Sequence, residues 1–158
     1  MAEKTFYDIL QERQADTRKY KGKLILKKKD IHWHVSPQGR NAAVVDVTSG
    51  IEAKTFGMVL TEIPPGGQSG LHKHTFEAAA YVLEGDGYEL IGDERVDWET
   101  GDFFYMPPNV NHRHVNKSQD KPVRLLQVEA WPLMIYLGIS EMIQQEVAGR
   151  APLTKVAE

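Results

Sequence analysis

A glycine-rich turn that leads into a pair of alternating histidines constrains this chain more than any other feature. The turn Gly66-Gly67-Gln68-Ser69-Gly70 comes shortly before His72-Lys73-His74. On an extended strand, residues i and i+2 point to the same face, so both imidazoles can reach one ion. The stretch therefore predicts a metal site carried by a β-strand.

A second histidine pair with similar surroundings lies downstream. Gly101 begins this segment, the pair Pro107-Pro108 interrupts it, and His112-Arg113-His114 follows. Two such strands can line one pocket, provided that the fold places them side by side.

Short strand-like stretches separated by glycine and proline fill most of the chain. We expect strands at 42–47, 54–63, 78–83, 88–91, 103–106 and 123–130, with a hairpin turn at 84–87. Because helical patterns do not alternate with these strands, the sequence favours an all-β fold, an antiparallel jelly roll or barrel.

Helices are expected only near the two ends. Residues 4–20 carry Phe6, Ile9 and Leu10 among charges, which favours a surface helix. Ser140 could cap a second helix over about 139–148. A length of 158 residues with 41% apolar content fits one domain spanning 1–158.

Composition excludes several classes of partner. A net charge of -3 gives no basic field for nucleic acid or an anionic membrane. The absence of cysteine excludes disulfides and thiolate ligands. No apolar run is long enough to span a membrane, and the first residues show no signal peptide, so we expect a cytoplasmic protein.

At the histidine segments the sequence resembles the cupin superfamily over about residues 54–131, which implies a jelly-roll barrel. Asn109 stands where the second cupin motif has glycine, and asparagine tolerates the positive φ of such a position. The usual glutamate is missing, because Ala78 and Ala79 occupy its place and Glu77 falls one residue short. The positions that fit the two motifs are Gly66, His72, His74, Gly101, Pro107, His112 and Asn116.

The resemblance implies a metal site formed by His72, His74 and His112 without a carboxylate. Three neutral imidazoles leave the ion its full double charge, which favours an anionic chelating substrate. Fe(II) is the ion we expect, while zinc, manganese, nickel and copper also suit three imidazoles. The alternative is that each histidine is only a structural residue of its strand.

Several further residues are candidates for the site. His114 could be catalytic, by contacting substrate or handling a proton, could complete a four-histidine site, or could merely orient the ligands. Gln127 on the last strand is a candidate substrate-binding residue. We expect the third pair, His32 and His34, to lie on a sheet face or in a subunit contact, with metal binding as the alternative.

Within the superfamily, the chain resembles the three-histidine group around gentisate and hydroxynaphthoate dioxygenases. The position that holds the substrate carboxylate with an arginine in those relatives is Ala80 here. Arg40 or Arg95 could hold an anion instead, although the sequence places neither in the pocket.

The leading hypothesis is an iron(II) dioxygenase or related oxidoreductase that acts on a small chelating aromatic or dicarbonyl-type substrate. One alternative is a redox-neutral metal enzyme, such as an isomerase, cyclase, decarboxylase or hydrolase. The other is a non-catalytic cupin that binds a small ligand. A homodimer is expected, because cupins commonly pair through their sheets.

Overall fold

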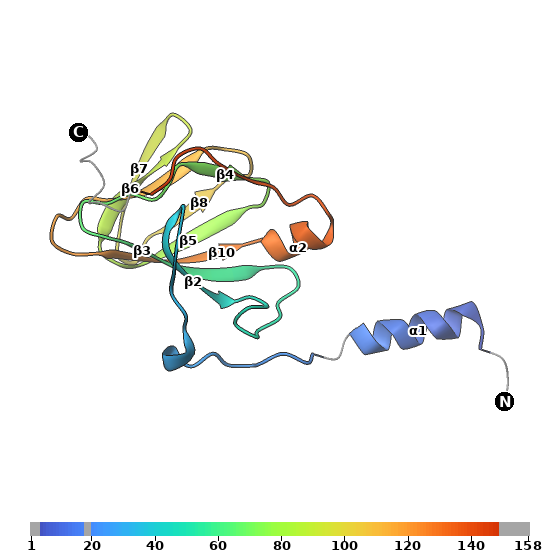
Figure 1. Cartoon of the computed structure of the whole chain (residues 1–158). Helices are drawn as coiled ribbons and strands as arrows, with labels where there is room; N and C mark the ends of the chain where they lie inside the picture. Colours follow the sequence, from blue (N-terminus) through green and yellow to red (C-terminus); the bar gives the residue numbers. More distant parts are fainter. Residues whose placement is uncertain (1–3, 18–19, 149–158) are drawn as a thin grey trace.

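Two antiparallel sheets face each other in the computed structural model, which describes residues 4–17 and 20–148 (Figure 1). One sheet has six strands in the order β1-β2-β3-β10-β5-β8, and the other has five in the order β11-β4-β9-β6-β7. This architecture confirms the predicted antiparallel jelly-roll barrel. In chain order the strands are β1 (His34–Ser36), β2 (Gly39–Val45), β3 (Gly57–Ile63), β4 (His72–His74), β5 (Ala78–Glu84), β6 (Asp86–Ile91), β7 (Glu94–Glu99), β8 (Phe103–Met106), β9 (His112–Asn116), β10 (Val123–Glu129) and β11 (Met142–Gln144).

The turn at 84–87 is not the hairpin that the sequence predicted. Strands β5 and β6 belong to different sheets, and Gly85, with a φ of 96°, lies where the chain passes from one sheet to the other. The hairpin occurs one strand later, where Gly92 and Asp93 join the paired strands β6 and β7. Glycine at the first position of a two-residue turn is typical of such hairpins.

The described residues also form two short α-helices, α1 (Phe6–Thr17) and α2 (Trp131–Tyr136), and a 3-10 turn, η1, which covers Lys28–Asp30. Helix α1 lies within the predicted range of 4–20, of which residues 18–19 are outside the described part. In Figure 1 this helix stands apart from the two sheets. The expectation of a single domain over 1–158 stays a prediction.

The helix predicted over 139–148 is wrong. Residues 142–144 form strand β11, whose Met142 and Gln144 pair with His74 and His72 of β4. The capping signal at Ser140 is local, and pairing with the open edge of β4 overrides it because this satisfies the backbone groups of both strands. The helix in this region is instead α2, which has proline in its first turn.

The interior of the barrel is divided into an apolar half and a polar half. Along β10, Val123 and Leu125 are fully buried in the core, whereas Gln127 and Glu129 on the same face line a cavity. The apolar half consists of Ile63, Ala78, Ala80, Val82, Trp98, Phe104, Met106, Val123 and Leu125. The fold thus reserves one end of the barrel for a site. None of the described helices is long and apolar enough to cross a membrane.

Candidate metal centre

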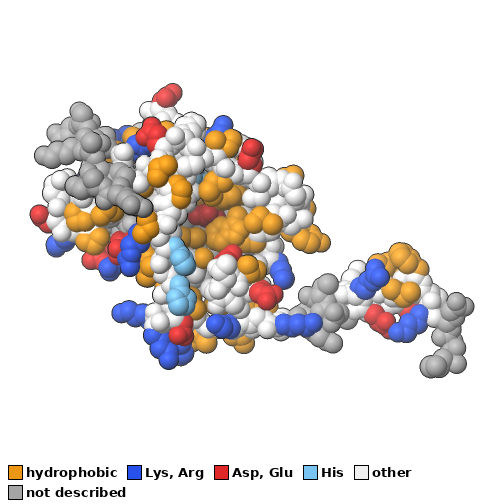
Figure 2. Space-filling model, in the orientation of Figure 1, with side chains coloured by type: hydrophobic (Ala, Val, Ile, Leu, Met, Phe, Trp, Pro, Cys, Tyr) orange, Lys and Arg blue, Asp and Glu red, His pale blue; other side chains and the backbone are white. Residues whose placement is uncertain are grey.

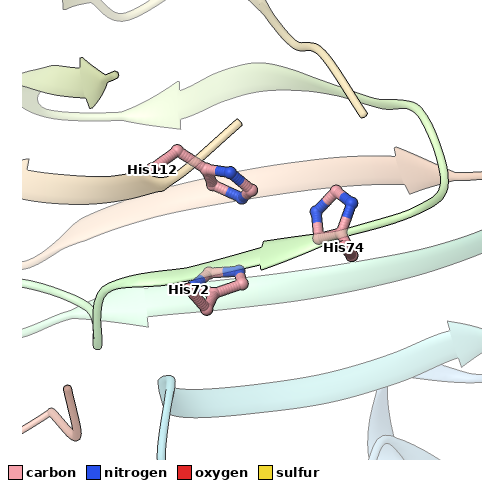
Figure 3. A group of neighbouring side chains, drawn as sticks. All are labelled: His72, His74 and His112. Atoms are coloured by element: carbon pink, nitrogen blue, oxygen red, sulfur yellow. The ribbon is translucent and has the colours of Figure 1, made fainter. Parts of the chain in front are cut away.

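Three buried histidines from two neighbouring strands meet at the polar end of the barrel. His72 and His74 lie on β4, and His112 lies on β9 directly opposite His72. The nitrogens that these residues offer as ligands all lie within 4.8 Å of one another. Figure 3 shows the three rings gathered in one space between the strands. The structure thus brings together the three residues predicted as ligands.

Each of the three rings is held by a backbone carbonyl two residues away. The Nδ1 atoms of His72 and His112 lie 2.8 Å and 3.0 Å from the carbonyl oxygens of Gly70 and Val110. The Nδ1 atom of His74 lies 2.7 Å from that of Phe76. Because a carbonyl only accepts, Nδ1 carries the proton in each ring, and Nε2 presents its lone pair.

The surroundings keep these imidazoles neutral, which is the form that binds metal. Burial lowers the pKa of His72 to about 4 and that of His112 to about 2. Burial lowers the pKa of His74 as well. A proton therefore does not compete for the three Nε2 atoms near neutral pH.

The Nε2 atom of His112 shows whether the site fits a metal ion. Nε2 of His112 is buried and has no hydrogen-bond partner among the described residues. A buried nitrogen without a partner costs free energy, and an ion bound by the three Nε2 atoms would satisfy it. The donor set therefore fits a divalent cation that accepts imidazole.

The turn before β9 supports the same arrangement. Asn109 has a φ of 63°, as expected for the residue that replaces the motif glycine. Its backbone N–H donates to the carbonyl oxygen of His74 at 2.7 Å. This bond ties the second histidine segment to the first.

His114 is placed apart from the three-histidine group by its own hydrogen bonds. Its Nδ1 lies 2.6 Å from the buried carboxylate of Glu89, and its Nε2 lies 2.9 Å from the amide nitrogen of Gln127. Gln127 accepts in turn from the hydroxyl of Thr61. The fourth histidine is therefore joined to a polar chain that crosses from the five-stranded to the six-stranded sheet.

A cavity of about 440 Å³ opens beside the histidines. Figure 2 shows a hollow on this face, with acidic atoms recessed among hydrophobic side chains. Most of the wall surface is apolar, and the polar side chains of the wall come from β1, β2, β3, β4, β9 and β10 as well as from the loops. The main lining residues are Val59, Thr61, His72, His74, Phe76, His114, Gln127, Glu129, Trp131, Ile135 and Met142.

Trp131 fixes one wall of this cavity. Its ring packs against the backbone of Gly57. A Cβ atom at Gly57 would lie only 1.9 Å from the ring, so that only glycine leaves room for the indole.

Other candidates from the sequence lie outside the three-histidine group. Glu77 is exposed and accepts a hydrogen bond from the hydroxyl of Tyr105 at 2.9 Å. His32 and His34 are both exposed, although His34 borders the cavity from β1. Arg40 pairs with Glu62, and Arg95 stacks on an aromatic ring outside the cavity.

Two carboxyl groups near the site were missed by the sequence reasoning. Glu89 faces His114 across paired strands, and Glu129 is the last residue of β10. The alternation of β10 could have indicated that Glu129 faces inward with Leu125 and Gln127. For Glu89 no such signal exists, because its position depends on which strands pair.

Comparison with known proteins agrees with this geometry. Residues 59–129 match the family described as the cupin domain. The segment is therefore a cupin domain, and it contains all three histidines of the group.

The chain is similar over parts of its length to two curated dioxygenases. It is 28% identical over 93 residues to 1-hydroxy-2-naphthoate 1,2-dioxygenase of Nocardioides sp. strain KP7, which covers 59% of this chain and 24% of that protein. It is 39% identical over 62 residues to gentisate 1,2-dioxygenase 1 of Aquipseudomonas alcaligenes, and this match covers 39% of this chain and 18% of that protein. The chain thus spans a quarter or less of these relatives.

Among solved structures, the salicylate 1,2-dioxygenase of Pseudaminobacter salicylatoxidans superposes with a TM-score of 0.60. The sequence identity is 19%, and the match covers 66% of this chain and 30% of that one. This similarity establishes the shared fold.

Proposed function

We propose that this protein is a metal-dependent cupin enzyme, an iron(II) dioxygenase or related oxidoreductase acting on a small chelating aromatic or dicarbonyl-type substrate. The observation that carries the proposal is the set of three buried imidazoles, each with Nε2 directed away from its carbonyl partner, beside a cavity of about 440 Å³. The similarity to dioxygenases supports the reaction class.

In this proposal, His72, His74 and His112 hold the cation. A divalent ion bound there would supply Lewis-acid chemistry, and iron would add redox chemistry with dioxygen. Three protein ligands suffice to hold an ion and leave room for a substrate that chelates through two oxygens. The absence of a carboxylate ligand favours a substrate that brings the negative charge itself.

The remaining residues orient the substrate and keep water away. The apolar side chains of Phe76, Trp131 and Ile135 would contact a planar ring or alkyl group. Gln127 stays the candidate for a polar contact with substrate, and His114 stays the predicted proton-handling residue. Because both nitrogens of His114 are engaged by Glu89 and Gln127, such a role requires these bonds to rearrange.

Oxygen consumption by the reconstituted protein tests the proposal. Metal-free protein is loaded anaerobically with Fe(II) and screened against diketones, catechols and hydroxybenzoates with an oxygen electrode. We expect uptake with at least one chelating substrate and none in the His72→Ala variant. The exposed His32→Ala variant should behave like the wild type. Uptake with no member of the panel would reject the dioxygenase assignment.

A redox-neutral enzyme is the second candidate, because three neutral imidazoles are also a common donor set for zinc. Zinc in protein purified from its own host, together with turnover that is the same with and without oxygen, would select this candidate. Ligand-induced stabilisation without turnover would instead select a binding protein.

A further inference from the structure

Glu129 is the one acidic side chain that the described part of the chain contributes to the cavity wall. It is the last residue of β10, and strand alternation directs it to the same side as Leu125 and Gln127. Trp131, two residues further along, lines the same cavity. The carboxyl group therefore belongs to the site and not to the outer surface.

This carboxyl group has no hydrogen-bond partner in the described part of the chain. Within residues 4–17 and 20–148, the carboxyl group of Glu129 accepts no hydrogen bond, and the influences on its pKa are burial and the charge of His114. Burial raises the pKa of Glu129 to about 7, with the charge of His114 acting in the opposite direction. A half-buried carboxyl group of this kind is stabilised by any ligand that offers it an N–H or O–H group.

No lysine or arginine from the described residues lines the cavity. Arg113 pairs with Glu146, and Arg124 pairs with Glu62 and Glu84 away from the site. A carboxylate on the substrate would thus meet a carboxyl group instead of a cation.

We propose that Glu129 determines the substrate specificity of the cavity. The cavity accepts a chelating substrate whose far end is neutral or carries a hydrogen-bond donor or an ammonium group. It disfavours aromatic carboxylates. This inference rests on the proposed function and narrows its substrate class. It separates this chain from the relatives named for gentisate, salicylate and hydroxynaphthoate, all of which are hydroxy acids. Selectivity arises from repulsion as much as from attraction.

Binding of three related probes to the zinc-loaded protein tests the inference without turnover. Catechol, its carboxylate derivative protocatechuate and its aminomethyl derivative dihydroxybenzylamine share the same chelating diol. Affinities are measured by calorimetry at about pH 8, where a carboxyl group of pKa near 7 is mostly ionised. We expect protocatechuate to bind about tenfold or more weakly than catechol, and dihydroxybenzylamine at least as tightly as catechol.

Two variants complete the test. Glu129→Gln should bring catechol and protocatechuate within about threefold of each other, because the like charge is gone. Glu94→Gln, at an exposed carboxylate on β7, should leave the wild-type ratio unchanged. Circular dichroism and a zinc content of one ion per chain establish that each variant is folded.

The outcomes separate the inference from the function on which it rests. Equal binding of catechol and protocatechuate by the wild type would overturn the role of Glu129 and leave the proposed function intact. An unchanged ratio of catechol affinity to protocatechuate affinity in Glu129→Gln would also overturn the role of Glu129 and leave the proposed function intact. If zinc binds but none of the probes does, the chelating pocket itself is rejected. Should Glu129→Gln fail to fold, two measurements decide whether Glu129 sets the specificity. These are the ratio of catechol affinity to protocatechuate affinity in the wild type and the same ratio in Glu129→Asp, which should be retained.

Discussion

His72 and His112 face each other directly across the pairing of β4 with β9, with ring centroids 4.3 Å apart. Each ring is fixed through Nδ1 by the carbonyl two residues before it. Both side chains therefore reach the same point with the same nitrogen, although they come from distant parts of the sequence.

Removal of either histidine should abolish tight metal binding. In His72→Ala or His112→Ala, two imidazoles remain, and we expect zinc affinity to fall by at least about 100-fold, since even residues that only orient ligands affect affinity by up to that amount. Calorimetric titration measures the change. His32→Ala, an exposed histidine, is the control and should bind zinc as the wild type does. Unchanged affinity in His112→Ala would remove this residue from the site.

Metal affinity should be nearly independent of pH between about 5.5 and 8. The pKa of His72 is lowered to about 4 and that of His112 to about 2, so protons compete with the metal for these two ligands only below this range. Burial lowers the pKa of His74 in the same direction. Histidines with an ordinary pKa of about 6.5 would instead lose roughly tenfold in affinity per residue on going to pH 5.5. Cobalt(II) absorbance titrations at several pH values distinguish the two cases.

Glu89 should stabilise the fold through His114. In Glu89→Ala, Nδ1 of the fully buried His114 loses its partner, which should lower the free energy of unfolding by at least about 1–3 kcal/mol. Glu89→Gln should cost less, because the carboxamide oxygen still accepts from Nδ1–H. Urea unfolding of the metal-free variants provides the comparison. Equal stability of Glu89→Ala and the wild type would contradict the prediction.

Gly57→Ala should displace Trp131 from the cavity wall. The added methyl group would meet the indole ring, and overpacking of this kind costs about 1–3 kcal/mol. We expect reduced stability and altered tryptophan fluorescence. In a Trp131→Leu background the same glycine substitution should cost clearly less, and equal costs in the two backgrounds would show that Gly57 does not act through the indole.

The protein is predicted to be a homodimer. The six-stranded sheet exposes four large hydrophobic side chains, namely Leu83, Phe103, Tyr105 and Val128. Sedimentation at micromolar concentration should give twice the chain mass of 17.9 kDa. Phe103→Asp should shift the mass toward one chain, and a wild-type mass of one chain would refute the dimer.

Sequence reasoning succeeded where the relevant signal was local. The two His-x-His segments have the period of a strand, and Asn109 occupies a turn position that needs a positive φ, as found. It failed where strands from distant segments compete for pairing. Ser140 signalled a helix, but the edge of β4 recruited residues 142–144 as β11. Gly85 signalled a hairpin, but its neighbouring strands pair with other partners.

The sequence by itself determined that this chain forms short antiparallel strands carrying histidines in pairs, because side-chain alternation and turn chemistry act over a few residues. Only the tertiary structure decided which carboxyl groups accompany those histidines. Among 22 acidic residues, Glu89 and Glu129 face the interior because of the register between strands that are distant in sequence. The register that places Glu89 beside His114 is set by burial of the whole apolar face and cannot be inferred from the residues beside Glu89, whereas the alternation along β10 does indicate the side on which Glu129 lies.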